Sequence, residues 1–229
     1  VLLSRNIDLK RKTKFKPRKG TKEGIINREV FIGRTYNDFK DLNPPYFCEM
    51  DTVISAKGSN KCILTFYIPE MELFIARLLN RCTTGAVRAA IDQIEHSLGT
   101  YNFLSVFEVC LTDRGSEFGK AEDIETGVNG IQRMSLYYCD PMRSNQKGGI
   151  ENVHTMLRMI IPKGTVFETL SQWDIKKAVN HINATPRQKL NGKTPYELAL
   201  NKWGPEILEA LQLRYVCPDD VTLSPKLLK

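Results

Sequence analysis

The sequence lacks several features that would place it in whole classes of protein. No apolar run approaches the roughly 20 residues of a membrane-spanning helix, and no apolar stretch follows the basic N-terminus, so we expect neither a membrane span nor an export signal. The six cysteines include no C-x-x-C pair, and none of the three histidines is spaced to share a zinc ion with them. Reduced core cysteines in a soluble cytosolic protein are the expectation.

Positive charge is concentrated at one end of the chain. Residues 1–20 hold eight basic side chains and one acid, a surplus equal to the net charge of +7 of all 229 residues. A basic arm on a neutral body is typical of proteins that grip nucleic-acid phosphates, although a solvated terminus that binds nothing specific has the same composition. The arm residues predicted to contact DNA are Lys10, Arg11, Lys12, Lys14, Lys16, Arg18 and Lys19. The first residue is Val, not Met, which favours a fragment of a longer protein.

Hydrophobic patterning predicts one α/β domain between two appendages. We expect a basic extended linker over 1–44, because prolines at 44 and 45 block a helix. A domain over 45–203 and a helical C-terminal tail over 204–229 follow. Strand-like apolar runs lie at 47–54, 62–68, 71–79, 103–112 and 135–139, and helical periodicity at 84–98, 151–160, 171–183, 194–202 and 205–212. This order suits a mixed five-stranded sheet flanked by helices, as in the ribonuclease-H-like fold, though other α/β folds begin the same way.

Three acidic residues occupy unusual positions. Asp51 lies inside an apolar strand, where an acid is costly unless it is paired or bound to a metal. Asp113 comes directly after an apolar run, where ligands gather in α/β sheets. Glu151 opens a predicted helix after a polar, glycine-containing loop. Taken alone, Glu151 reads better as a surface residue that complements the helix dipole.

Together these acids suggest a metal site. Carboxylates from two strands and one helix suit Mg²⁺, which prefers carboxylates, waters and substrate phosphate oxygens. Two such ions activate the attacking oxygen and stabilise the leaving oxygen in phosphoryl transfer. We expect Asp51 and Asp113 on adjacent strands, with all three acids within bridging distance, and Glu49 as a nearby supporting acid on the same strand face as Asp51.

The helix predicted to begin at Glu151 has a second, polar face. Glu151, His154, Thr155 and Arg158 share it by their spacing. We assign Arg158 and the preceding Lys147 to phosphate positioning, and His154 to a contact with a reacting oxygen. The alternative is a solvated face on which Arg158 pairs with a surface acid.

Three segments resemble the catalytic boxes of DDE transposases and retroviral-type integrases: Glu49-Met50-Asp51-Thr52-Val53, Leu111-Thr112-Asp113-Arg114-Gly115-Ser116-Glu117-Phe118 and Gly148-Gly149-Ile150-Glu151-Asn152. The fuller resemblance is to bacterial insertion-sequence transposases of the IS30 family. It covers roughly residues 28–203 and adds the segments Tyr138-Cys139-Asp140-Pro141, Pro162-Lys163-Gly164-Thr165 and 183–197. Two positions depart from the family pattern, because Arg114 and Ile150 stand where Asn is common.

The resemblance implies a ribonuclease-H-like fold, catalysis by Asp51, Asp113 and Glu151, and two Mg²⁺ ions that Mn²⁺ can replace. It implies cutting of DNA at transposon ends and joining of the freed 3′-hydroxyl to target DNA. The implied partners are DNA, further copies of the chain on DNA, and an upstream helix-turn-helix region. The implied location is the bacterial cytoplasm, on the nucleoid.

Further DNA contacts are expected from Arg114, Lys147, His154, Arg158 and Lys163. Two other functions remain open from the residues alone. One is a nuclease that only hydrolyses, and the other is an inactive, transposase-derived DNA-binding protein.

Overall fold

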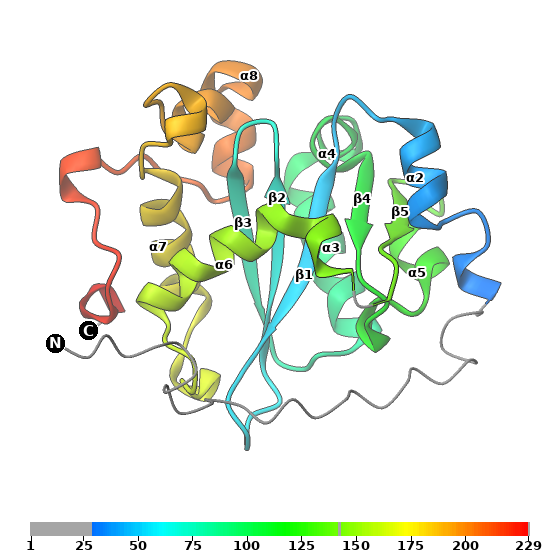
Figure 1. The fold of residues 1–229 in the computed structure, drawn as a ribbon, viewed down its shortest axis with the longest axis horizontal. Coiled ribbons are helices and arrows are strands. Elements are labelled where there is room, and N and C mark those ends of the chain that lie inside the picture. The colour runs from blue at the N-terminus through cyan, green and yellow to red at the C-terminus, as the bar shows by residue number, and fades with distance from the viewer. Residues whose placement is uncertain (1–28, 142, 229) are drawn as a thin grey trace, which may run out of the picture.

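The computed structural model describes residues 29–141 and 143–228 (Figure 1). The arm residues predicted to contact DNA, from Lys10 to Lys19, lie outside the described part of the chain. Within that part, no helix is long and apolar enough to cross a bilayer.

A mixed five-stranded sheet forms the centre of the domain, as expected. The strands are β1 (Cys48–Ile54), β2 (Cys62–Ile68), β3 (Leu73–Leu79), β4 (Val109–Thr112) and β5 (Ser135–Tyr138), in the order β3-β2-β1-β4-β5. The first three form an antiparallel meander, because short turns join them. β4 and β5 then run parallel to β1. β1 is therefore central, with an antiparallel neighbour on one side and a parallel neighbour on the other.

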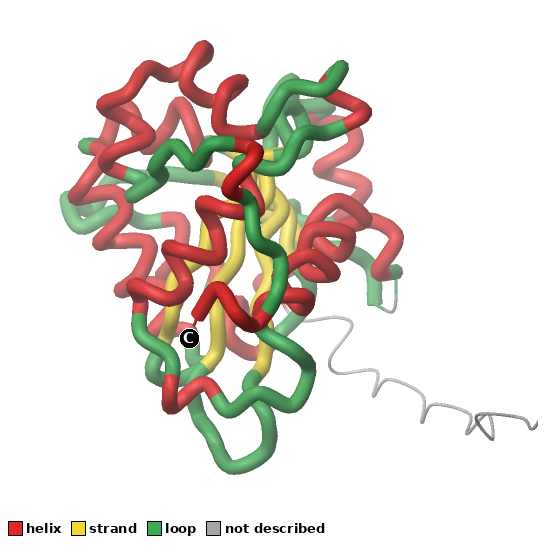
Figure 2. The backbone as a smooth tube through the Cα atoms, turned by 90° about the vertical axis from the view of Figure 1, so that its left-hand side faces the viewer, coloured by secondary structure: helices red, strands yellow, loops and turns green. Residues whose placement is uncertain are grey.

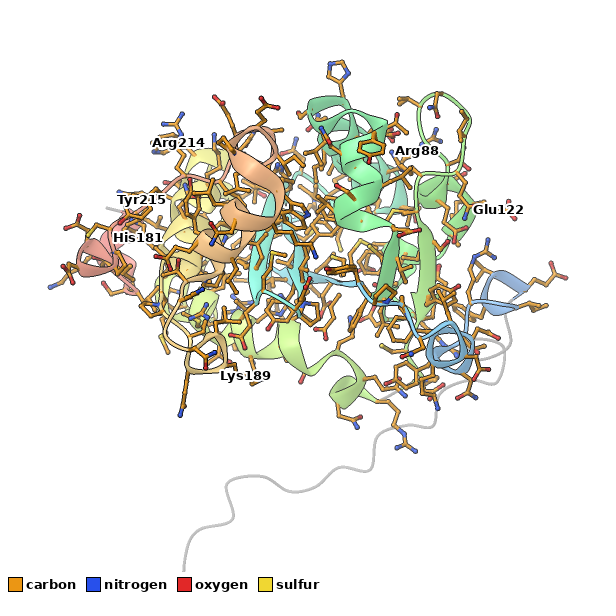
Figure 3. All side chains as sticks on the ribbon, turned by 90° about the horizontal axis from the view of Figure 1, so that it is seen from above. Arg88, Glu122, His181, Lys189, Arg214 and Tyr215 are labelled. Atoms are coloured by element: carbon orange, nitrogen blue, oxygen red, sulfur yellow. The ribbon has the colours of Figure 1, made fainter. Side chains whose placement is uncertain are left out.

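Helices cover both faces of this sheet (Figures 1 and 2). α6 (Gly148–Ile160) crosses one face and packs on β1 and β2. α3 (Thr84–Leu98) and α4 (Thr100–Phe107) lie on the other face, as the view from above also shows (Figure 3). α7 (Gln172–Asn183) lies along β3, and α5 (Ala121–Glu125) contacts β5. The buried side of each long helix and most of the buried strand residues form one large hydrophobic core, and a smaller cluster lies around Phe39, Val109 and Leu111.

Residues 29–44 are not the extended linker that the sequence suggested. A short 3₁₀ helix, Glu29–Phe31, is followed by α2 (Tyr36–Leu42), which ends before the two prolines. Thr35 begins α2 with a capping box to Asp38, and Asn43 ends it in a left-handed conformation. Phe31 and Phe39 are buried. The prolines therefore mark the end of a helix rather than a helix-free segment.

The apolar run over 103–112 is half helix and half strand, contrary to the single predicted strand. α4 buries Phe103, Val106 and Phe107 at helical spacing, and the short strand β4 carries the rest of the run. Gly99, with a φ of 73°, lets α3 end and α4 begin in the next residue.

The C-terminal tail is less helical than expected. α8 (Pro195–Ala210) is broken at Gly204, close to the predicted gap between two helices. Beyond it, residues 211–228 contain only two 3₁₀ turns, Pro218–Asp220 and Pro225–Leu228. All six cysteines are free, and four of them are buried, as expected for core residues.

Candidate active site

Two of the three predicted acids are brought side by side by the parallel pairing of β1 and β4. Glu49 pairs with Leu111 in the register of these strands. Asp51 and Asp113 each lie two residues further along, so they reach the same level on the same face. Asp51 lies within β1, whereas Asp113 comes directly after the last residue of β4, so it lies just beyond the adjacent strand rather than on it.

A single ammonium group lies between the two carboxylates. Lys147 Nζ is 3.4 Å from Asp51 Oδ2 and 3.7 Å from Asp113 Oδ2, and it donates a hydrogen bond to the backbone oxygen of Met50 at 3.2 Å. The Lys147 side chain is only 6% exposed. Burial raises the pKa of Asp51, and the charge of Lys147 opposes that rise. Lys147 was expected to be a phosphate contact, but its ammonium group is committed to the carboxylates.

The third acid lies on the helix that follows Lys147. α6 begins at Gly148, three residues earlier than predicted, so Glu151 occupies the first turn rather than the first position. Its side chain is exposed. Among residues 29–141 and 143–228, no three Asp, Glu, His or Cys side chains form a group with metal-binding spacing. Asp51 and Asp113 meet, and the participation of Glu151 stays a prediction.

Glu49 is close to the site, as the strand period suggested, but it contacts the helix. It is 5% exposed, and its Oε2 accepts a hydrogen bond from the Ile150 amide at 2.6 Å. Burial raises the pKa of Glu49, and the amides of Ile150 and Gly149 and the charge of Lys147 oppose the rise.

His154 and Arg158 do not share one solvated stripe with Glu151. His154 Nε2 lies 2.9 Å from Thr65 Oγ1 on β2, and its ring packs edge-on against Phe74. Burial, with the nearby charges of Lys147 and Arg158, lowers the pKa of His154 to about 4, so the ring is neutral at physiological pH. Arg158 is half-buried and donates to the backbone oxygen of Ile54 at 3.3 Å rather than to a surface acid.

The remaining two predicted contacts, Lys163 and Arg114, have different surroundings. Lys163 is exposed and lines a groove with Arg158 and Lys57 at the far end of β1. Lys57 was missed, although its place in the turn after the Asp51 strand was a usable signal. Arg114 packs its guanidinium 4.4 Å from the centre of the Phe31 ring and donates to the Cys139 backbone oxygen at 3.2 Å.

The chemistry of the donor set suits a hard divalent cation. Asp51 and Asp113 present carboxylate oxygens toward one point, and the ammonium of Lys147 shows that a positive charge is accommodated there. Glu151 would add a third carboxylate from the first turn of α6.

Sequence comparison finds insertion-sequence transposases. The chain is 35% identical over 85 residues, 37% of its length, to the transposase for insertion sequence element IS4351 of Bacteroides fragilis. It is 32% identical over 88 residues, 38% of its length, to the transposase InsI for insertion sequence element IS30A of Escherichia coli strain K12. The matches cover 25% and 21% of those relatives, so the chain matches only part of them. No protein-family model matches the chain.

Structure comparison supports the fold. A chain of the simian T-cell lymphotropic virus intasome, solved in complex with the PP2A regulatory subunit B56 gamma, superposes with a TM-score of 0.50 and 17% identity. The match covers 68% of this chain and 54% of that one. At this identity the likeness concerns the fold alone, a mixed five-stranded sheet flanked by helices of the ribonuclease-H-like, integrase-core type. The expected resemblance is therefore confirmed: this chain is similar in sequence to transposases of bacterial insertion sequences, IS30 among them, and it has the expected ribonuclease-H-like fold.

Proposed function

We propose that this chain is the catalytic part of a DNA transposase that transfers phosphoryl groups at the ends of a mobile element. The observation that carries the proposal is the pair Asp51 and Asp113, which face one another around a single cationic centre at the end of β4. Carboxylates so close together repel unless a cation neutralises them, and phosphoryl transfer by the two-metal route requires such a site.

Asp51, Asp113 and Glu151 would hold two Mg²⁺ ions, or Mn²⁺ in their place. Bound there, the ions would lower the cost of generating the attacking oxygen and of releasing the leaving oxygen. The donors are all carboxylates, the ligand type that these ions prefer.

The chain's other residues would place the DNA. Lys57, Arg158 and Lys163 line one groove beside the strand that carries Asp51, which suits a phosphate backbone arriving from that side. His154 is neutral and bonded to Thr65, so it suits holding α6 on the sheet better than transferring a proton. Lys147 balances the charge of Asp51 and Asp113.

The proposed partners follow from the same activity. They are DNA at the element's ends, target DNA, further copies of the chain on that DNA, and an upstream helix-turn-helix region. The names of the relatives support the DNA partners, since both are transposases of insertion sequences.

A strand-transfer assay with the full-length protein, Mg²⁺ and DNA carrying the element's ends tests this function. Joined products are expected from the unaltered protein. Nicks without joining would instead indicate a hydrolytic nuclease, and binding without cleavage an inactive DNA-binding protein.

Two substitutions in α6 sharpen that assay. Glu151→Gln should abolish cleavage and joining with DNA affinity nearly unchanged, because it removes a carboxylate at constant shape. Arg158→Ala should weaken DNA binding or turnover with little change in melting temperature. Thr155→Ala is the matched control, since Thr155 is exposed on the same helix and carries no charge. An unchanged Arg158→Ala protein would remove Arg158 from the DNA path.

A further inference from the structure

The first turn of α6 is fastened to β1 through one buried carboxylate. Glu49 Oε2 accepts the Ile150 amide at 2.6 Å, and this amide is one of the helix-end donors that have no partner within the helix. A carboxylate is also the charge that a helix N-terminus favours. This hydrogen bond links the part of β1 that carries Asp51 to the turn of α6 that carries Glu151. Glu49 is two residues from Asp51, and Ile150 is next to Glu151.

The same turn rests on an aromatic ring that leaves no room for a side chain. Glu49 and Tyr67 are paired residues of β1 and β2, so their side chains lie next to each other under the first turn of α6. A β-carbon added to Gly149 would overlap the Tyr67 ring and come within 3.1 Å of Glu49 Oε2. One added to the neighbouring Gly148 would meet nothing within 4 Å. Of these two glycines, only Gly149 therefore requires the absence of a side chain.

We propose that Glu49 and Tyr67 are positioning residues that set the height of the first turn of α6 above the sheet, and thereby the reach of Glu151 toward Asp51 and Asp113. The inference rests on the proposed function, since it assigns Glu151 to the cation site. Glu49 acts through the helix and not as a metal ligand, because its Oε2 atom accepts the hydrogen bond from the Ile150 amide and the residue is only 5% exposed.

Two glycine substitutions in the full-length protein test the fit against the ring. Gly149→Ala should lift the first turn, lower Mn²⁺ affinity measured by electron paramagnetic resonance at least tenfold, and slow strand transfer accordingly. Gly148→Ala, the matched control, should stay within twofold of the unaltered protein. Adding Tyr67→Leu to Gly149→Ala should restore most of the affinity, because the smaller side chain removes the overlap.

Two substitutions of Glu49 test the hydrogen bond. Glu49→Gln keeps an oxygen that can accept the Ile150 amide, so its Mn²⁺ affinity should stay within threefold. Glu49→Leu removes the acceptor and should lower the affinity tenfold or more. If Glu49 were a metal ligand, Gln would be as damaging as Leu. If its role were only structural, the melting temperature would fall with no change in Mn²⁺ affinity. Either pattern overturns the proposal.

Amide hydrogen exchange separates failure of this inference from failure of the proposed function. Glu49→Leu and Gly149→Ala should speed exchange at the Ile150 and Glu151 amides, whether or not the protein joins DNA. Slow exchange equal to that of Gly148→Ala would refute the positioning role. An unaltered protein that neither binds Mn²⁺ nor joins DNA would refute the proposed function instead.

Discussion

At the scale of single residues, charge balance at the site depends on Lys147. Its ammonium lies within 4 Å of both Asp51 and Asp113 although its side chain is almost wholly buried. A buried cation of this kind is stable only because paired acids offset the loss of its hydration. The carboxylates of Asp51 and Asp113 thus surround a positive charge that the protein itself supplies. This arrangement fits a role in binding cations together with anionic phosphates.

His154 gives a prediction about pH. The pKa of His154 in the folded protein is about 4, below the ordinary value of 6.5. The unfolded chain therefore binds a proton more readily, and the free energy of unfolding falls as the pH drops from 6.5 toward 4. The unaltered protein should lose about 2 kcal/mol of unfolding free energy between pH 7 and pH 5 from this group. Urea unfolding at both pH values measures this loss.

His154→Gln should remove most of that loss, since glutamine has no proton to gain. His96→Gln is the control, because His96 is exposed on α3. Equal pH dependence in the unaltered protein and the His154→Gln variant would contradict a half-buried, neutral histidine.

Individual site residues differ in how far the sequence revealed them. Asp51 and Asp113 were predictable because an acid inside or just beyond an apolar strand needs a special partner. The partner itself, Lys147, was not, because α6 begins before Glu151 and carries the lysine down onto the sheet. His154 was misjudged because spacing along a helix defines a face but not which neighbouring element that face meets.

At the scale of elements, the free edge of β3 is closed by side chains of α7. Asn183 accepts a hydrogen bond from the Phe74 amide at 2.9 Å and donates one to the Phe74 oxygen at 2.7 Å. At the other end of α7, Gln172 accepts from the Leu78 amide at 2.7 Å. An open sheet edge invites pairing with another chain, so α7 protects β3.

Asn183→Ala should therefore be strongly destabilising. It leaves the Phe74 amide and carbonyl without partners in a buried place, which costs about 2–4 kcal/mol. Chemical denaturation measures the cost. Asn180→Ala on the same helix is the control, since it removes only an exposed bond to the Arg214 amide. Similar losses in the two variants would mean that closing the edge contributes little.

Helices and strands could be predicted where a single hydrophobic periodicity continued without interruption. The helix over 84–98 and the strands of the meander were found because each has a single pattern and clear turn residues at its ends. The run over 103–112 was misassigned because a buried helix and a buried strand are both continuously apolar. α2 was missed because its seven residues are mostly polar, and its stability comes from Phe39 packing into a separate small cluster.

For the whole molecule, the order of strands and helices could be predicted from the sequence, but the boundaries of the domain could not. Strands, helices and strands in sequence pointed to a mixed sheet, and the sheet has the expected five strands. The domain begins earlier than expected, because residues 31–35 pack on β5 through Phe31 and through the pairing of Thr35 with Tyr138. Contacts of this kind join distant parts of the chain and leave no periodic signal in the sequence.

The basic arm gives a prediction for the whole molecule. Residues 1–20 carry a charge surplus equal to that of the entire chain, so they should supply affinity for DNA that does not depend on its sequence. The logarithm of the DNA association constant falls linearly with the logarithm of the salt concentration. Deleting the arm should make this slope less steep by about 0.9 for each duplex-DNA phosphate that the arm neutralises. Fluorescence anisotropy over a salt series measures the slope. An unchanged slope would make the arm a linker only.

Asp51, Asp113 and Glu151 are proposed to bind divalent cations at one site. Anomalous diffraction from crystals of the chain grown with saturating Mn²⁺ would locate those cations. We predict anomalous peaks within about 2.5 Å of carboxylate oxygens from all three residues, with the ammonium of Lys147 moved away from the peak. Peaks at other residues, or no peak near Asp51 and Asp113 at saturating Mn²⁺, would contradict this proposal.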